Sequence, residues 1–168
     1  LIWAASQGHT NVIRTLLIKG AKITKKDANG KTALAHAATK DHFSTAKVLI
    51  KFGADLNHDL LYAARRGYNK MVNFLLDEKA DVDYISVKSE TALTLAIQEK
   101  QIETVRILLE SGANTAVQNA KEQTPLMIAV LTGETEIVKL IFQHQKLDTS
   151  PAKLDTADFI GNTPLMVS

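Results

Sequence analysis

Apolar residues follow a pattern along this chain that repeats about every 33 residues. Each copy opens with a leucine that is followed three and four residues later by two small or branched apolar residues. The five copies are Leu1–Ala5, Leu34–Ala38, Leu60–Ala64, Leu93–Ile97 and Leu126–Val130. Their leading leucines are 33, 26, 33 and 33 residues apart, and a partial sixth copy begins at Thr163. A fixed period of this length indicates a repeat architecture.

A second apolar block follows each of these copies. In this block apolar residues recur at i, i+3 and i+4, which predicts a second amphipathic helix. The second helices are expected within residues 12–17, 46–50, 71–76, 102–109 and 137–141. Between the two helices stands a residue for a left-handed turn, and these residues are Gly8, Asp41, Gly67, Lys100 and Gly133. A further break follows the second helix at Gly20, Gly53, Lys79 and Gly112. Each unit therefore reads as helix, tight turn, helix and loop.

The loop before a first helix carries turn and capping signals. Asp27 is followed three residues later by Gly30, a spacing that favours a short hairpin. Thr32, like its equivalents Thr91, Thr124 and Thr163, is placed to cap the next helix. Pro125 and Pro164 follow two of these threonines, at a helical position where a missing N–H costs nothing.

These residues together give the chain a family resemblance. The sequence contains, in order, Asp27, Gly30, Thr32, Leu34, Ala37-Ala38, Leu49, Gly53-Ala54-Asp55 and Asn57, and in them it resembles the ankyrin repeat family. The resemblance implies an all-α solenoid of stacked helix-turn-helix units with short β-hairpin or loop fingers. We expect a single array over residues 1–168, with units at about 1–26, 27–58, 59–84, 85–117 and 118–157 and a partial unit at 158–168. Because both ends cut a repeat, we also expect the chain to be a fragment of a longer one.

The sequence departs from the family pattern in three ways, and each departure predicts a structural feature. The histidine that the family places after the first leucine is replaced by Ala35, Leu61, Thr94, Met127 and Met166, so apolar packing is expected there. The 26-residue spacing shortens the loop at Asn57-His58-Asp59, which predicts a notch without a finger. The longer spacing near the end predicts a protruding, irregular loop at about residues 147–157.

The composition excludes several classes of site and of function. The chain has 168 residues with 45% apolar and 23% charged residues and no cysteine. The absence of cysteine excludes disulfides, thiolate metal sites and a cysteine nucleophile, and it favours a reducing, cytoplasmic location. No apolar run approaches the roughly 18 residues that span a bilayer, so no membrane segment is expected.

Motifs for catalysis are also missing. Glycines fit neither nucleotide-binding pattern nor a nucleophile elbow, and His9, His36, His42, His58 and His144 are scattered. We therefore expect no catalytic residues, no metal, no cofactor and no enzyme within this chain.

The resemblance implies partner binding through a concave face, made of finger tips and the residues around each Ala pair. In the first three units the positions with charges or rings are Trp3, Lys26, Lys31, His36, Lys40, Tyr62, Arg65 and Arg66. They hold cations and rings and no carboxylate, which favours a protein partner with an acidic segment. The alternative is that the lysines are ordinary solvated charges. Residues 1–84 hold 13 Lys and Arg against 8 Asp and Glu, whereas residues 85–168 hold 7 against 10.

The later units offer a more apolar surface. Leu95, Ile128 and Leu131 are expected to be exposed and to anchor a partner, with the alternative that neighbouring loops cover them. Nucleic acid is an unfavoured partner because the second half is acidic.

Two further readings stay open. Leu49 and Asp55-Leu56-Asn57 resemble the site of the asparagine hydroxylase that acts on ankyrin repeats, so Asn57 is a candidate for hydroxylation, or it is simply a turn residue. The array is either a scaffold in its own right or the substrate-recruiting arm of an enzyme or host-directed effector.

Overall fold

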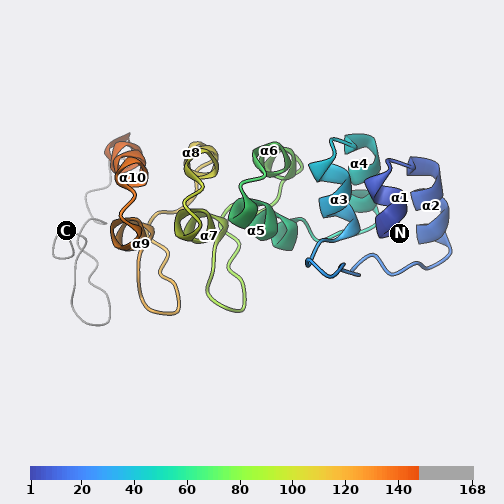
Figure 1. The fold of residues 1–168 in the computed structure, drawn as a ribbon, viewed down its shortest axis with the longest axis horizontal. Coiled ribbons are helices and arrows are strands. Elements are labelled where there is room, and N and C mark those ends of the chain that lie inside the picture. Colours follow the sequence, from blue (N-terminus) through green and yellow to red (C-terminus); the bar gives the residue numbers. More distant parts are fainter. Residues whose placement is uncertain (148–168) are drawn as a thin grey trace. The chain divides into compact units, whose positions relative to one another are not determined.

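The computed structural model describes residues 1–147, with side chains as far as Gln145. Within these residues the chain forms ten helices in five consecutive pairs (Figure 1). They are α1 (Ile2–Ser6), α2 (Thr10–Ile18), α3 (Ala33–Thr39), α4 (Phe43–Lys51), α5 (Leu56–Arg66), α6 (Asn69–Asp77), α7 (Ala92–Gln98), α8 (Ile102–Glu110), α9 (Pro125–Thr132) and α10 (Thr135–Leu147). The expected all-α repeat of helix pairs is confirmed. The chain divides into two compact units, unit 1 (residues 1–63 and 68–81) and unit 2 (residues 64–67 and 82 onward).

Unit 1 is built by packing first helices together and second helices together. α1 contacts α3, α2 contacts α4, and α3 also packs on α4 and α6. The Ala pairs of α1 and α3 are fully buried, and small side chains allow helices to approach closely. Larger side chains complete the core, which includes Ile13, Leu34, Leu49, Leu60, Met71 and Leu75.

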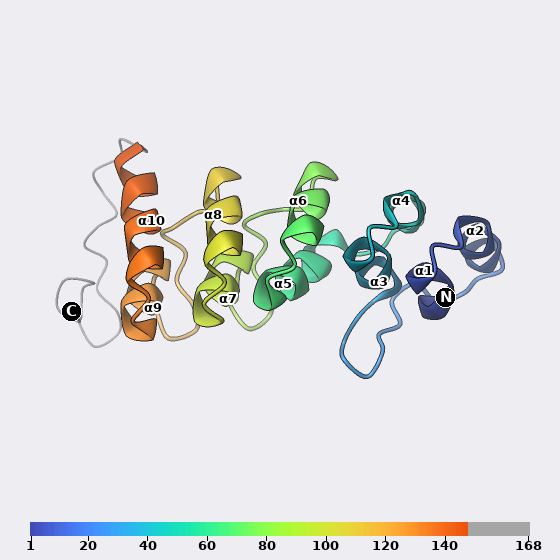
Figure 2. The same cartoon turned by 45° about the horizontal axis from the view of Figure 1, so that its top comes forward.

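Unit 2 repeats this arrangement. α7 packs against α9, and α10 packs against both α8 and α9. Figures 1 and 2 both show α7 beside α9 and α8 beside α10. The largest fully buried side chains of this unit are Leu93, Ile97, Leu108, Met127, Ile137 and Ile141.

The turns have the backbone that the sequence predicts. Gly8, Gly67 and Gly133 follow the first helices with φ of 69°, 68° and 73°. Asp41 and Lys100 occupy the same position with φ of 59° and 57°, so two side chains accept a left-handed conformation that normally favours glycine.

The fingers and caps also form as expected. The Asp27 carboxylate accepts hydrogen bonds from the N–H groups of Asn29 and Lys31, and Lys26 pairs with Thr32 in an isolated antiparallel bridge. Side-chain oxygens of Ser86 and Asn119 take the place of Asp27 in the next two fingers. The hydroxyls of Thr32, Thr91 and Thr124 cap α3, α7 and α9.

Two irregular regions differ from the others. No finger separates α4 from α5, as predicted, but residues 57–59 are helical and not a loop, because α5 already begins at Leu56. At the other end α10 continues to Leu147 without the glycine that follows α2, α4 and α8. The expected loop beyond Leu147 and the partial unit 158–168 lie outside the described residues.

Candidate functional site

The residue before each Ala pair is of a different type in the two units. In unit 1 this position holds Trp3, His36 and Tyr62, and Trp3 is the most open of them, with 70% of its surface exposed. The ring of Trp3 lies 5.7 Å from that of His9, in a tilted arrangement. An exposed tryptophan supported by a neighbouring ring is a suitable anchor for a protein partner.

His36 connects the first helix of its repeat to the finger. Its Nε2 lies 2.7 Å from Oδ2 of Asp27. The hydrogen bond from His36, followed by that from the Lys31 N–H, lowers the pKa of Asp27 below its usual range. The imidazole is therefore held by a carboxylate, so the expectation that this strip contains no carboxylate is wrong.

Lys31 is held by two side chains of unit 1. Its Nζ donates to the hydroxyl of Thr39 at 3.2 Å and lies 5.1 Å from the centre of the Tyr68 ring. The Tyr68 ring is in turn 6.0 Å from that of Tyr62. We call Lys31, Thr39, Tyr62 and Tyr68 the lysine–tyrosine cluster. Sequence reasoning missed Tyr68, although it follows the turn glycine Gly67 as His9 follows Gly8.

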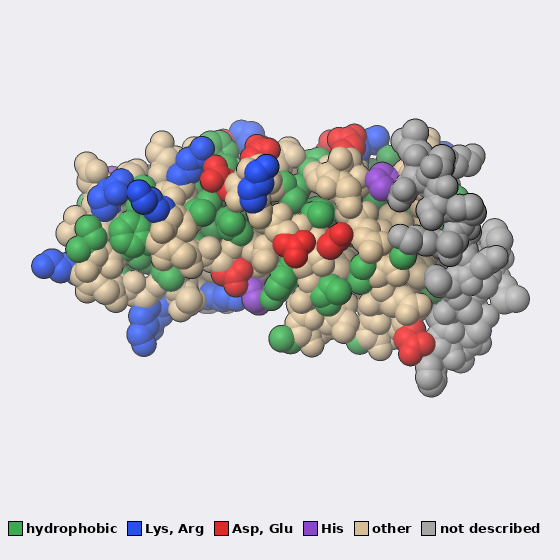
Figure 3. Space-filling model, turned by 180° about the vertical axis from the view of Figure 1, so that it is seen from behind, with side chains coloured by type: hydrophobic (Ala, Val, Ile, Leu, Met, Phe, Trp, Pro, Cys, Tyr) green, Lys and Arg blue, Asp and Glu red, His purple; other side chains and the backbone are tan. Residues whose placement is uncertain are grey.

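The remaining cations differ in their surroundings. Lys40 is exposed at the C-cap of α3. Arg65 and Arg66 are exposed in the last turn of α5, and Arg65 Nη2 forms an ion pair of 3.1 Å with Glu90. This pairing is a second departure from the carboxylate-free strip. The face in Figure 3 exposes Lys and Arg side chains as well as Asp and Glu side chains.

The expected apolar surface of unit 2 is largely inside the unit. Leu95 is 2% exposed and Ile128 is 4% exposed, so the expectation that both are open to a partner is wrong. Both lie on helices that pack against each other, α7 and α9, and an aliphatic side chain gains by burial in such a contact. Leu131 is 57% exposed at the end of α9 and stays available.

Asn57 lies in the first turn of α5 and connects two repeats of unit 1. Its Oδ1 accepts a hydrogen bond of 2.8 Å from the N–H of Asp81. The equivalent residue in the next repeat, Asp83, accepts from the N–H of Asn114 at the same distance. Asn57 thus has a structural role, and its hydroxylation stays a prediction.

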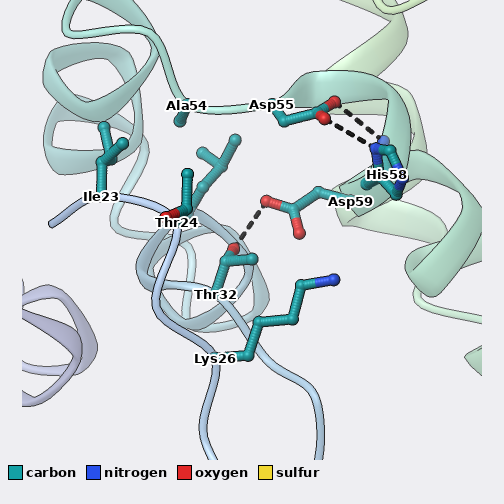
Figure 4. A pocket seen from close by; sticks show the side chains of 9 residues that line it. Ile23, Thr24, Lys26, Thr32, Ala54, Asp55, His58 and Asp59 are labelled. Atoms are coloured by element: carbon teal, nitrogen blue, oxygen red, sulfur yellow. Dashed lines mark hydrogen bonds and ion pairs between the residues drawn. The ribbon is translucent and has the colours of Figure 1, made fainter.

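A pocket in unit 1 lies between the finger before α3 and the start of α5 (Figure 4). Ile23, Thr24, Lys26, Thr32, Leu34, Ala54, Asp55, His58 and Asp59 line this cavity of about 210 Å³. Asp59 is 2% exposed, and its Oδ2 accepts a hydrogen bond of 2.6 Å from the Thr32 hydroxyl. The 26-residue spacing predicted a notch here but not a buried carboxylate within it.

The described part of the chain offers neither a metal-binding cluster nor a membrane-spanning helix. Residues 1–147 contain no group of three or more His, Cys, Asp or Glu side chains placed to hold a metal ion. None of the ten helices is long and apolar enough to cross a membrane.

Comparison with known proteins identifies the repeats. A family model of three ankyrin repeats matches residues 1–60 and again 59–119. The chain is 32% identical over 117 residues to an ankyrin repeat and KH domain-containing protein of Caenorhabditis elegans, which aligns 64% of the chain and 4% of that protein.

Two plant proteins are similar to the same degree. One is a potassium channel of Arabidopsis thaliana, 33% identical over 110 residues, or 62% of the chain and 14% of the channel. The other is a probable E3 ubiquitin-protein ligase of rice, 31% identical over 111 residues, or 60% of the chain and 22% of the ligase. The matched region is thus a small part of each relative.

Proposed function

Because the chain belongs to the ankyrin repeat family, whose repeats bind other proteins, we propose that it recruits a protein partner through an acidic segment. In this proposal the segment lies against the first helices and finger of unit 1. The chain binds the partner and does not itself catalyse a reaction. The lysine–tyrosine cluster is the observation that carries the proposal.

The cluster favours a carboxylate ligand because its cation is already positioned. Thr39 and Tyr68 hold the Lys31 ammonium, so less conformational entropy is lost when a partner binds it. Exposed Lys40 adds a second positive charge, and exposed Trp3 supplies an apolar contact of the kind that dominates binding energy. Positive groups and an exposed ring in the same unit suit an acidic segment that also carries an apolar side chain.

A charge-matched pair of variants tests this proposal. Lys31→Gln with Lys40→Gln removes two positive charges from the finger and first-helix side of unit 1. Lys19→Gln with Lys51→Gln removes two exposed charges from the ends of its second helices, α2 and α4. Each double variant and the wild type would capture partners from a lysate, and the affinity for each recovered protein would then be titrated at several salt concentrations.

We expect the first double variant to bind about five- to tenfold more weakly, with a shallower salt dependence, and the control to bind as the wild type does. Equal losses in both double variants would mean that only net charge matters. Unchanged affinity in the first would show that the acidic segment does not lie on this surface.

A second function is favoured by one relative. The rice protein is named a probable E3 ubiquitin-protein ligase, and its similarity to this chain is limited to 22% of its length. An array of this kind would then be the substrate-recruiting arm of an enzyme whose catalytic part lies elsewhere. Determining the full coding sequence and testing the full-length protein for ubiquitin transfer to a captured partner separates this function from a simple scaffold.

A further inference from the structure

The pocket at the start of α5 contains a carboxylate whose charge is incompletely matched. Asp59 Oδ2 accepts from Thr32, and no described hydrogen bond ends on Oδ1, which is not one of the buried polar atoms without a partner and therefore touches solvent in the pocket. In Figure 4 one oxygen of Asp59 points at Thr32 and the other lies on the side where Lys26 extends. No ion pair joins Lys26 to Asp59 in the described part of the chain, and the second carboxylate, Asp55, is already paired with His58 at 2.6 Å.

The environment of Asp59 explains why a positive ligand is favoured. Burial raises the pKa of Asp59 to about 6, against the opposing effects of the Thr32 hydrogen bond and the charge of Lys26. The group is therefore mostly ionised at pH 7.5, although only 2% of its surface is exposed. A charge largely removed from water carries a desolvation cost, which a cation in the pocket would further offset.

The rest of the lining suits a long side chain with a charged end. Ile23, Leu34 and Ala54 give the cavity apolar walls that match a methylene stem. A guanidinium is more weakly hydrated than an ammonium and is favoured for buried ion pairs. The cavity of about 210 Å³ is large enough for such a group.

We propose that this pocket binds an arginine side chain of a protein partner, with its guanidinium on Asp59 Oδ1 and its stem against Ile23, Leu34 and Ala54. Asp59 lines a pocket here because the shortened repeat has no finger to fill it. This site goes beyond the acidic-segment surface, since it recognises the opposite charge with different residues.

A matched pair of small probes tests the pocket directly. N-acetyl-arginine amide and N-acetyl-citrulline amide have the same shape, but only the first is charged. Each would be titrated into the isotope-labelled chain at pH 7.5 while the methyl signals of Ile23, Leu34, Ala54 and Thr32 are followed by NMR. We expect the arginine probe to shift these signals in a saturable way and the citrulline probe to bind about tenfold more weakly.

Two variants complete the test. Asp59→Asn keeps the shape and an acceptor for Thr32 and should weaken the arginine probe about tenfold, whereas Lys26→Ala should strengthen it by removing a like charge. If this surface bound carboxylates, Lys26→Ala would weaken ligand binding and would not strengthen it. The two proposals can therefore fail independently. No saturable shift with the arginine probe, equal affinity for both probes, or unchanged affinity in Asp59→Asn would each overturn the proposal.

Discussion

The hydroxyl of Thr32, the N-cap of α3, donates a hydrogen bond of 2.6 Å to the buried carboxylate of Asp59 in the first turn of α5. The contact joins two consecutive repeats of unit 1. It links a helix cap to a carboxyl group whose pKa is raised by burial. It also gives the stability of this unit a specific dependence on pH.

Asp59→Asn should change the pH dependence of unfolding. The pKa of Asp59 is about 6 in the folded chain against 3.8 for an ordinary aspartate, so the folded state holds this proton more tightly than the unfolded state. The contribution of Asp59 to the unfolding free energy therefore falls as pH rises from about 4 to about 6, by about 3 kcal/mol in total, and is constant above. Urea unfolding across this range should show Asp59→Asn gaining on the wild type as pH rises. Parallel pH profiles would contradict this account.

Gly8→Ala should destabilise the chain more than Gly20→Ala. Both glycines have positive φ, 69° and 83°, and an alanine there costs about 1–2 kcal/mol from backbone strain alone. A Cβ on Gly8 would also lie 2.8 Å from Nδ1 of His42, whereas one on Gly20 would meet no atom within 4 Å. Urea unfolding of both variants measures the difference. Equal losses would mean that the His42 ring moves away at no cost.

Local features of the fold could be predicted from the sequence because each depends on a few neighbouring residues. The left-handed turns at Asp41 and Lys100 were placed by their register with Gly8, and Thr32 was identified as a cap from its position before an apolar helix. These signals need no knowledge of packing between repeats.

Features that depend on distant contacts could not be predicted in this way. At the position before the Ala pair, the side chain of Trp3 is exposed whereas that of Leu95 is buried. Leu95 is buried because α7 packs against neighbouring helices, a contact that the local sequence does not show. Arg65 pairs with Glu90, 25 residues further on, so its charge looked free in the sequence. Asp59 had a usable signal in the sequence, because the equivalent position in other repeats holds apolar Ala33, Ala92 and Pro125, which the structure buries.

Leu95→Ala should affect stability and not an exposed binding surface. Its side chain is buried in unit 2, so truncation should cost about 2–5 kcal/mol of unfolding free energy. Leu131→Ala is the matched control, since this leucine is exposed on α9 and its loss should change stability by less than about 0.5 kcal/mol. Thermal or urea unfolding of both variants is sufficient. Leu95→Ala with wild-type stability would mean that the residue is not packed as described.

Lys79→Gly should stabilise the chain by about 1 kcal/mol. Lys79 follows α6 with φ of 72°, at the position that Gly20, Gly53 and Gly112 occupy after α2, α4 and α8. A side chain in the left-handed conformation is strained, and glycine removes the strain while keeping the backbone N–H that donates to the Leu76 carbonyl at 3.0 Å.

Two variants separate backbone strain from loss of the lysine side chain. Lys79→Ala removes the same charge but keeps a Cβ, so it should give no gain in unfolding free energy. Lys100→Gly relieves a similar strain at φ of 57°, but it also removes an ion pair of 2.8 Å with Glu134 and should therefore gain less than Lys79→Gly. Equal stability of Lys79→Gly and Lys79→Ala in urea unfolding would show that the left-handed turn at this position carries no measurable strain.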